Sequence, residues 1–184
     1  MFEKNDAKND GLIGVDRTIS VASMSWNASG NGAAEESLGS YKVLRYGDIA
    51  FEGNRTKGHP YGKLVINDIG TGIMSSRFRT LKPKAEICVP FWKYYLTDAD
   101  VFTNVCLNST KRGTLMNELV VNNLFEQAVS IPSSFPEQRA IGSLFSRLDS
   151  LITLHQREVG TRGSHTQPLA NIQHDHTRQR PLTV

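Results

Sequence analysis

Two short segments of the chain have the spacing of nucleotide-binding motifs, and each lacks a residue that the chemistry requires. The segment Gly53–Pro60, GNRTKGHP, has the G-x-x-x-x-G spacing of a phosphate-binding loop. His59 and Pro60 stand where a Lys and a Ser or Thr would contact phosphate and magnesium. The segment Gly70–Ser75, GTGIMS, lacks the third glycine of a dinucleotide-binding turn. Neither segment predicts a nucleotide site.

Acidic and thiol side chains give no clearer catalytic pattern. Asp48, Glu52 and Asp68 could bind a metal ion in a nuclease, but no spacing singles them out. Cys88 and Cys106 stand far apart without a C-x-x-C pair, so we expect reduced, buried thiols and neither zinc nor a disulfide. The residues therefore predict a non-catalytic protein with no metal site.

Composition sets the outer limits. A chain of 184 residues with 39% hydrophobic residues can bury one core and carry an appendage. The net charge of +3 permits contact with nucleic acid, although an ordinary, slightly basic protein fits it equally well. The start of the chain is polar, and no apolar run has the length of a membrane span, so we expect a cytoplasmic protein without a membrane segment.

The residue pattern predicts a mixed α+β fold, with a globular domain at residues 1–132. Alternating apolar residues and glycine turns predict strands at Thr18–Ser23, at two places within Tyr41–Glu52, at Gly62–Asp68, at Gly72–Pro83 and at Ala128–Pro132. Pro90 and the spacing of the aromatic residues predict a helix at Val89–Asn104. Leu115–Gln127 fits either a strand or a helix.

A long helix is predicted at residues 133–159. Ser134 and Glu137 have the spacing of a capping box. The predicted partner-facing stripe consists of Ile141, Leu144, Leu148 and Leu151, at the spacing of a coiled-coil seam, widened by Phe145 and Ile152. We expect this stripe to contact a helix of another polypeptide, although a helix that folds back on its own domain would use the same side chains.

The apolar pattern ends after Val159. Gly160, Gly163 and Pro168 would each disfavour a helix, and the surrounding residues are mostly polar. We therefore predict a disordered basic tail at residues 160–184.

The helix segment resembles the DNA-specificity subunit of bacterial type I restriction-modification systems. In that family a target-recognition domain is followed by a helix with a P-E-Q-x-x-I start and an L-D-x-x-I step. The residues that match are Pro136, Glu137, Gln138, Ile141, Leu148, Asp149 and Ile152. Upstream, YKVLRYGDIAF, GHPYG and GIMSSRF are similar to strand and turn elements of the same family. The resemblance covers residues 41 to 158 and continues more faintly toward the N-terminus.

The resemblance implies a non-catalytic subunit that binds double-stranded DNA in a sequence-specific manner. Its partners would be methyltransferase subunits and, through them, restriction subunits. These partners would methylate adenine with S-adenosylmethionine or cut unmodified DNA with ATP and Mg²⁺, so no cofactor is expected in this chain.

Complete members of the family carry two recognition domains and two helices, whereas this sequence shows one of each. The chain would then be a half-length subunit that pairs with a second specificity chain through the helix, or a gene fragment without function. Its domain could be truncated at the start, and its tail could be a frame-shift product. A helix-mediated interaction module that reads no DNA is the remaining alternative.

A domain that reads duplex DNA needs cations for phosphates and hydrogen-bonding side chains for base edges. The candidates form three clusters in glycine-rich stretches: Asn54, Arg55, Lys57 and His59; Arg77 and Arg79; Lys111 and Arg112. We expect Arg77 and Arg79 to lie on one side of a strand, with Phe78 turned into the core. Each of these cations could instead be an ordinary solvated surface residue.

Overall fold

The computed structural model describes residues 1–30 and 35–163 of the chain. The chain divides into two units, Met1–Arg147 and a second unit that begins at Leu148, and each is described by itself. The strands are β1 (Phe2–Lys4), β2 (Ile19–Ser20), β3 (Ser25–Trp26), β4 (Lys42–Leu44), β5 (Ile49–Glu52), β6 (Lys63–Ile66), β7 (Gly72–Met74), β8 (Arg79–Pro83), β9 (Thr110–Arg112) and β10 (Asn117–Leu119). The helices are α1 (Val89–Tyr95), α2 (Ala99–Ser109), α3 (Val121–Phe125) and α4 (Phe135–Gly163), with short 3-10 helices at Val15–Arg17 and Glu35–Ser40. The mixed α+β fold is confirmed.

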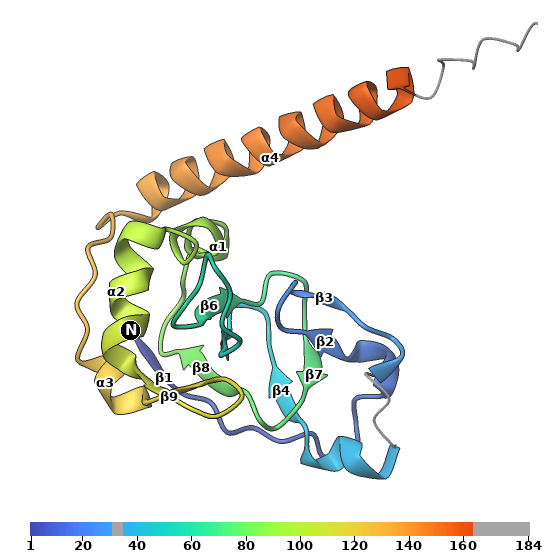
Figure 1. The fold of residues 1–184 in the computed structure, drawn as a ribbon, viewed down its shortest axis with the longest axis vertical. Helices are drawn as coiled ribbons and strands as arrows, with labels where there is room; N and C mark the ends of the chain where they lie inside the picture. Colours follow the sequence, from blue (N-terminus) through green and yellow to red (C-terminus); the bar gives the residue numbers. More distant parts are fainter. Residues whose placement is uncertain (31–34, 164–184) are drawn as a thin grey trace, which may run out of the picture. The chain divides into compact units, whose positions relative to one another are not determined.

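The central sheet has the strand order β1-β8-β5-β6, and its neighbouring strands are antiparallel. Figure 1 shows α1 and α2 on one side of this sheet and the β4–β7 pair on the other. Ile49 and Phe51 of β5 point to the helical side, since side chains alternate along a strand. They pack with Leu64 of β6 and with Phe91 and Trp92 of α1 in the larger core cluster. This cluster fixes the helices on the sheet.

The opposite side of the sheet holds a second core cluster. Ala50 of β5 packs there with Leu44 of β4, Met74 of β7 and Ile19 of β2, and all four side chains are buried. Phe78 belongs to the same cluster, as the sequence predicts. The strand pairs β4–β7 and β2–β3 therefore form a layer against the central sheet.

The outer strand β1 has no counterpart among the predicted elements. It pairs with β8, with Phe2 opposite Pro83 and Lys4 opposite Leu81. The ring of Phe2 lies edge-on to Trp92, with 5.2 Å between the ring centroids. Three residues without an alternating pattern form a strand here because β8 offers unpaired backbone groups and the core accepts Phe2.

The predicted helix at Val89–Asn104 is wrong as a single element, because the structure has α1 and α2 in its place. The break lies at Asp98. The carboxylate of Asp98 accepts hydrogen bonds from the backbone N–H groups of Asp100 and Val101 and caps the start of α2.

Two strand predictions need correction as well. Ala128–Pro132 forms no strand; Val129 and Ile131 pack against the larger core cluster from an irregular segment. Their apolar character therefore reflects burial without sheet pairing. The strand expected at Thr18–Ser23 shortens to β2, because the chain turns from Val21 onward.

Helix α4 begins as the capping pattern predicts, since the backbone N–H of Glu137 donates to the Ser134 hydroxyl over 3.3 Å. Its first turns pack on the domain. A Cβ atom at Gly142 would lie only 2.8 Å from the backbone nitrogen of Phe91, so a glycine is needed where α4 meets α1. Further along, the ring of Phe145 stacks on Tyr94 with 5.3 Å between centroids.

The predicted end of this helix at Val159 is wrong. In the second unit α4 continues to Gly163. A glycine inside a helix costs only about 1 kcal/mol relative to alanine, so Gly160 is tolerated where a proline would not be. The remainder of the predicted tail, residues 164–184, lies outside the described residues.

Candidate nucleic-acid interface

The three predicted cation clusters meet at one end of the central sheet. Because its strands are antiparallel, the end of β5 and the starts of β6 and β8 lie at the same end, together with the end of β1. The loop of residues 53–62 connects β5 to β6 there. The turn of residues 75–78 leads into β8 at the same end. We call this end of the sheet the cation end.

The loop of residues 53–62 has a defined internal turn. The backbone N–H of His59 donates to the carbonyl of Thr56 over 3.2 Å, and the N–H of Thr56 donates to the carbonyl of His59 over the same distance. This places Lys57 within the tip of the turn, where it is exposed. At the base of the loop, the backbone N–H of Asn54 donates to the buried Glu52 carboxylate over 3.0 Å. The exposed side chains of Asn54 and Lys57 therefore rise from a fixed backbone.

The β9–β10 hairpin is tied to this loop, which brings the first and third clusters together. The guanidinium of Arg55 donates to the backbone carbonyls of Gly113 and Thr114 over 3.2 and 3.4 Å. The backbone N–H of Asn117 donates to the carbonyl of Gly53 over 2.8 Å. A Cβ atom at Gly53 would lie 2.2 Å from the carbonyl oxygen of Asn117, so the two backbones meet only because residue 53 is a glycine. Arg112 pairs with Asn117 across the hairpin and is exposed, as is Lys111.

The second cluster lies at the same end but in a different geometry from that predicted. Arg77 belongs to the turn before β8, whereas Arg79 is the first residue of that strand, so the two do not share one strand face. The prediction is wrong because the chain turns at residues 75–78 before it re-enters the sheet. Both arginines are exposed, and the guanidinium of Arg77 lies over the ring of Phe78 at 4.7 Å from its centroid.

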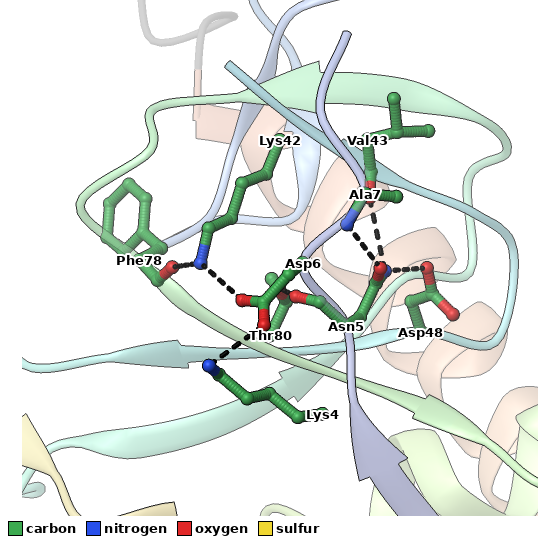
Figure 2. Close-up of polar contacts among 9 residues, drawn as sticks. All are labelled: Lys4, Asn5, Asp6, Ala7, Lys42, Val43, Asp48, Phe78 and Thr80. Carbon is green, nitrogen blue, oxygen red and sulfur yellow. Dashed lines mark hydrogen bonds and ion pairs between the residues drawn. The ribbon is translucent and has the colours of Figure 1, made fainter. Parts of the chain in front are cut away.

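The structure adds lysines that the sequence reasoning missed. Figure 2 shows Lys4 and Lys42 converging on Asp6, with nitrogen–oxygen distances of 2.8 and 3.8 Å. Lys42 also donates to the backbone carbonyl of Phe78 over 3.0 Å. The hydrogen bond from Lys4 holds the pKa of the Asp6 carboxyl below its usual value, and Lys42 and Arg79 act in the same direction. No local signal could have found this group, because backbone pairing between distant segments brings Lys42 to Lys4 and Asp6.

Burial affects the pKa of Lys42. Removal of its ammonium from water lowers the pKa of Lys42, an effect that Asp6 opposes and that Arg79 and Lys4 reinforce. Burial is the largest cause of the lowered pKa of Lys42, and repulsion from the neighbouring cations is a smaller one.

A buried polar network holds the segment that carries Lys4 and Asp6. The side-chain amide of Asn5 donates to the carboxylate of Asp48 over 2.9 Å and to the carbonyl of Val43 over 3.2 Å (Figure 2). Thr80 donates to the carbonyl of Asn5. Burial raises the pKa of Asp48, although the hydrogen bonds from the Arg45 backbone and from Asn5 act against the rise. The network fixes the chain direction just beyond β1.

The apolar stripe of α4 is mostly open to solvent. Ile141 is the exception, because it is half-buried and packs against the core of its own domain. That packing, together with the stacking of Phe145 on Tyr94, corrects the expected start of the partner-facing stripe. The exposed members are Leu144, Phe145, Leu148, Leu151 and Ile152, and Leu154, which the prediction omits, is exposed with them. Of these, Leu151 is 62% exposed, a high value for a leucine in a regular helix.

The comparison with protein families matches residues 6–159 to the type I restriction modification DNA specificity domain. The chain belongs to this family. The match begins at Asp6, well before residue 41, at which the clear sequence resemblance starts. It therefore includes Asp48 of the buried polar network but not Asn5. A search of curated protein sequences found no match.

As a member of the specificity-domain family, the chain is a DNA-recognition component that associates with other subunits of a restriction-modification system. Within the described residues, no three His, Cys, Asp or Glu side chains are grouped so that they could hold a metal ion. No helix in the part of the chain that the structure describes is long and apolar enough to span a membrane. The candidate functional surfaces of this specificity domain are the cation end and the exposed side of α4.

Proposed function

We propose that this specificity domain reads one part of a DNA target for a type I restriction-modification complex. The observation that supports the proposal is the gathering of Arg55, Arg79 and Arg112 at one end of the sheet in a member of this family. Lysine and arginine side chains would bind phosphates and set the salt dependence of binding. Hydrogen bonds from an arginine to guanine and from Asn54 to adenine would discriminate between base pairs in the major groove.

The exposed side of α4 would bind the partner subunits. Burial of Leu148 and Leu151 against other helices would stabilise such a complex by about 2 kcal/mol for each side chain. The partners we propose are methyltransferase subunits, restriction subunits bound through them, and a second specificity chain that reads the other half-site. Those subunits would use S-adenosylmethionine, ATP and Mg²⁺ to methylate adenine or cut unmodified DNA in the cytoplasm, and this chain would use none of them.

The test is co-expression of the full chain with a type I methyltransferase subunit, followed by mapping of methylated adenines across the host genome. We expect methylation at one defined sequence. Arg77→Ala and Lys111→Ala should weaken target binding by the purified complex, and each should reduce the slope of log affinity against log salt by about 1. Lys84→Ala is the matched control, because Lys84 follows the opposite end of β8 and is also exposed.

A different result would favour the interaction module that reads no DNA. In that case the complex would form through α4, but its DNA binding would show neither a preferred sequence nor a loss of affinity as the salt concentration rises. Equal effects of Lys84→Ala and Lys111→Ala would mean that the cation end is not the DNA-binding surface.

A further inference from the structure

Leu115 stands at the tip of the β9–β10 hairpin with 87% of its side chain exposed. A large apolar side chain in water contributes little to the stability of the folded domain. Single exposed leucines are common on protein surfaces, so exposure alone gives Leu115 no role. Its setting does.

The backbone that carries Leu115 is held in place on both sides. The N–H of Gly113 donates to the carbonyl of Met116 over 3.1 Å and closes the turn. Arg55 holds the carbonyls of Gly113 and Thr114 from outside the hairpin. At the base, the side chain of Asn117 donates to the carbonyl of Pro60 over 2.9 Å. Leu115 is therefore presented by a preorganised turn, and a ligand that meets it would lose little free energy in ordering the hairpin.

The charges around the tip favour an anionic ligand with an apolar feature. Arg112 and Arg55 flank the tip, and both are exposed. Glu118 stands opposite Lys111 in the hairpin. A two-stranded ribbon has the width that the major groove of duplex DNA accepts. The apolar feature of that groove is the 5-methyl group of thymine.

We propose that the β9–β10 hairpin enters the major groove and that Leu115 contacts the methyl group of one thymine in the recognised sequence. This inference rests on the proposed function, because it names one residue that would determine the target. Arg55 and Arg112 contact the phosphates or guanines beside that thymine. Leu115 is thus a specificity-determining residue that carries no charge and makes no hydrogen bond to the base.

The test uses the complex with its methyltransferase subunit and the DNA sequence found by methylation mapping. Each thymine of that sequence is replaced in turn by deoxyuridine, which lacks only the methyl group. We expect one replacement to weaken binding by the wild-type complex about 3- to 10-fold. Leu115→Ala should weaken binding to the unmodified duplex by a similar factor and should no longer distinguish thymine from deoxyuridine at that position.

Leu12→Ala is the matched control, because Leu12 is 89% exposed and lies in another segment of the domain. It should bind as the wild type does, with the same deoxyuridine effect. Thermal unfolding of both variants verifies that each is folded. Sequence-specific binding that is indifferent to deoxyuridine, or a Leu115→Ala complex that keeps the deoxyuridine effect, would overturn the inference alone. If Leu115→Ala weakens binding although no deoxyuridine replacement affects the wild-type complex, Leu115 contacts the DNA without reading a methyl group, and the inference is also overturned. A wild-type complex without sequence preference would overturn the proposed function and this inference together.

Discussion

The guanidinium of Arg55 donates a hydrogen bond to the backbone carbonyl of Gly113 over 3.2 Å, although 58 residues separate them in the chain. The contact joins the loop of residues 53–62 to the β9–β10 hairpin. Arg55 therefore holds the geometry of the cation end in addition to supplying charge to it.

The two roles of Arg55 can be separated by substitution. Arg55→Lys keeps the charge but replaces the guanidinium, which spans two carbonyls, with a single ammonium. We expect this variant to lose about 3- to 10-fold in preference for target over non-target duplex, while the salt dependence of binding stays the same. Arg55→Ala should reduce both the preference for the target duplex and the salt dependence of binding. Affinity for the two duplexes, measured at several salt concentrations with the assembled complex, checks this. Wild-type discrimination by Arg55→Lys would mean that the bridge to Gly113 is dispensable.

The close approach of α4 to α1 at Gly142 should limit substitution there. Gly142→Ala places a methyl group 2.8 Å from backbone atoms of Pro90 and Phe91, which cannot move aside as a flexible side chain can. We expect a net loss of about 1 to 3 kcal/mol in the free energy of unfolding, despite the higher helix propensity of alanine. Denaturant unfolding of the full chain measures the change. Gly58→Ala is the control, because a Cβ atom at Gly58 meets no atom within 4 Å. An equal effect of the two substitutions would contradict the packing argument.

Asp48 should make stability depend on pH. Its pKa is raised in the folded domain above the ordinary value of 3.8, so the folded state holds the proton more tightly than the unfolded chain does. The resulting stabilisation is complete below pH 3.8 and is lost as the pH rises through the raised pKa. The free energy of unfolding of the wild type, relative to Asp48→Asn, should therefore decrease as the pH rises through that window. Urea unfolding of both proteins at a series of pH values checks the sign. A difference that stays constant or grows would show that hydrogen bonds outweigh burial at Asp48.

The apolar side of α4 should govern assembly without affecting the domain. Leu148→Glu combined with Leu151→Glu should weaken association with the methyltransferase subunit at least about 100-fold, because two apolar contacts are replaced by buried charge. The melting temperature of the isolated chain should change little, since both leucines are exposed. The control is Ser143→Glu combined with Ser150→Glu, which adds the same charge to the other side of the helix. Equal loss of binding in the two double variants would exclude the stripe as the contact surface.

The elements that the sequence predicts well are those with a local signal. Alternation and glycine turns predict β4, β5 and β6 close to their observed bounds, and Ser134 predicts the start of α4. The break between α1 and α2 also has a local signal, because Asp98 is a favourable N-cap residue. The aromatic residues on both sides of Asp98 have helical spacing, and this spacing favoured a single helix in the prediction.

The remaining features depend on contacts between distant parts of the chain. Nothing in the polar first residues indicates that Lys4 will lie beside Lys42. The two are brought together by the pairing of β1 with β8 and by the backbone contacts of residues 7–9 with residues 41–43. The same is true of Ile141. Its spacing with Leu144 and Leu148 is that of a seam, and only the folded domain shows that its own core contacts Ile141.

The backbone contact between Gly53 and Asn117 bears on the engineering of new specificities. In a chimera that receives the hairpin of residues 110–119 from a relative, a backbone of different conformation would lie against residue 53. Not even one added carbon atom fits there. The loop and the hairpin should therefore be transplanted as a matched pair, and libraries that randomise the exposed tips should keep residue 53 fixed.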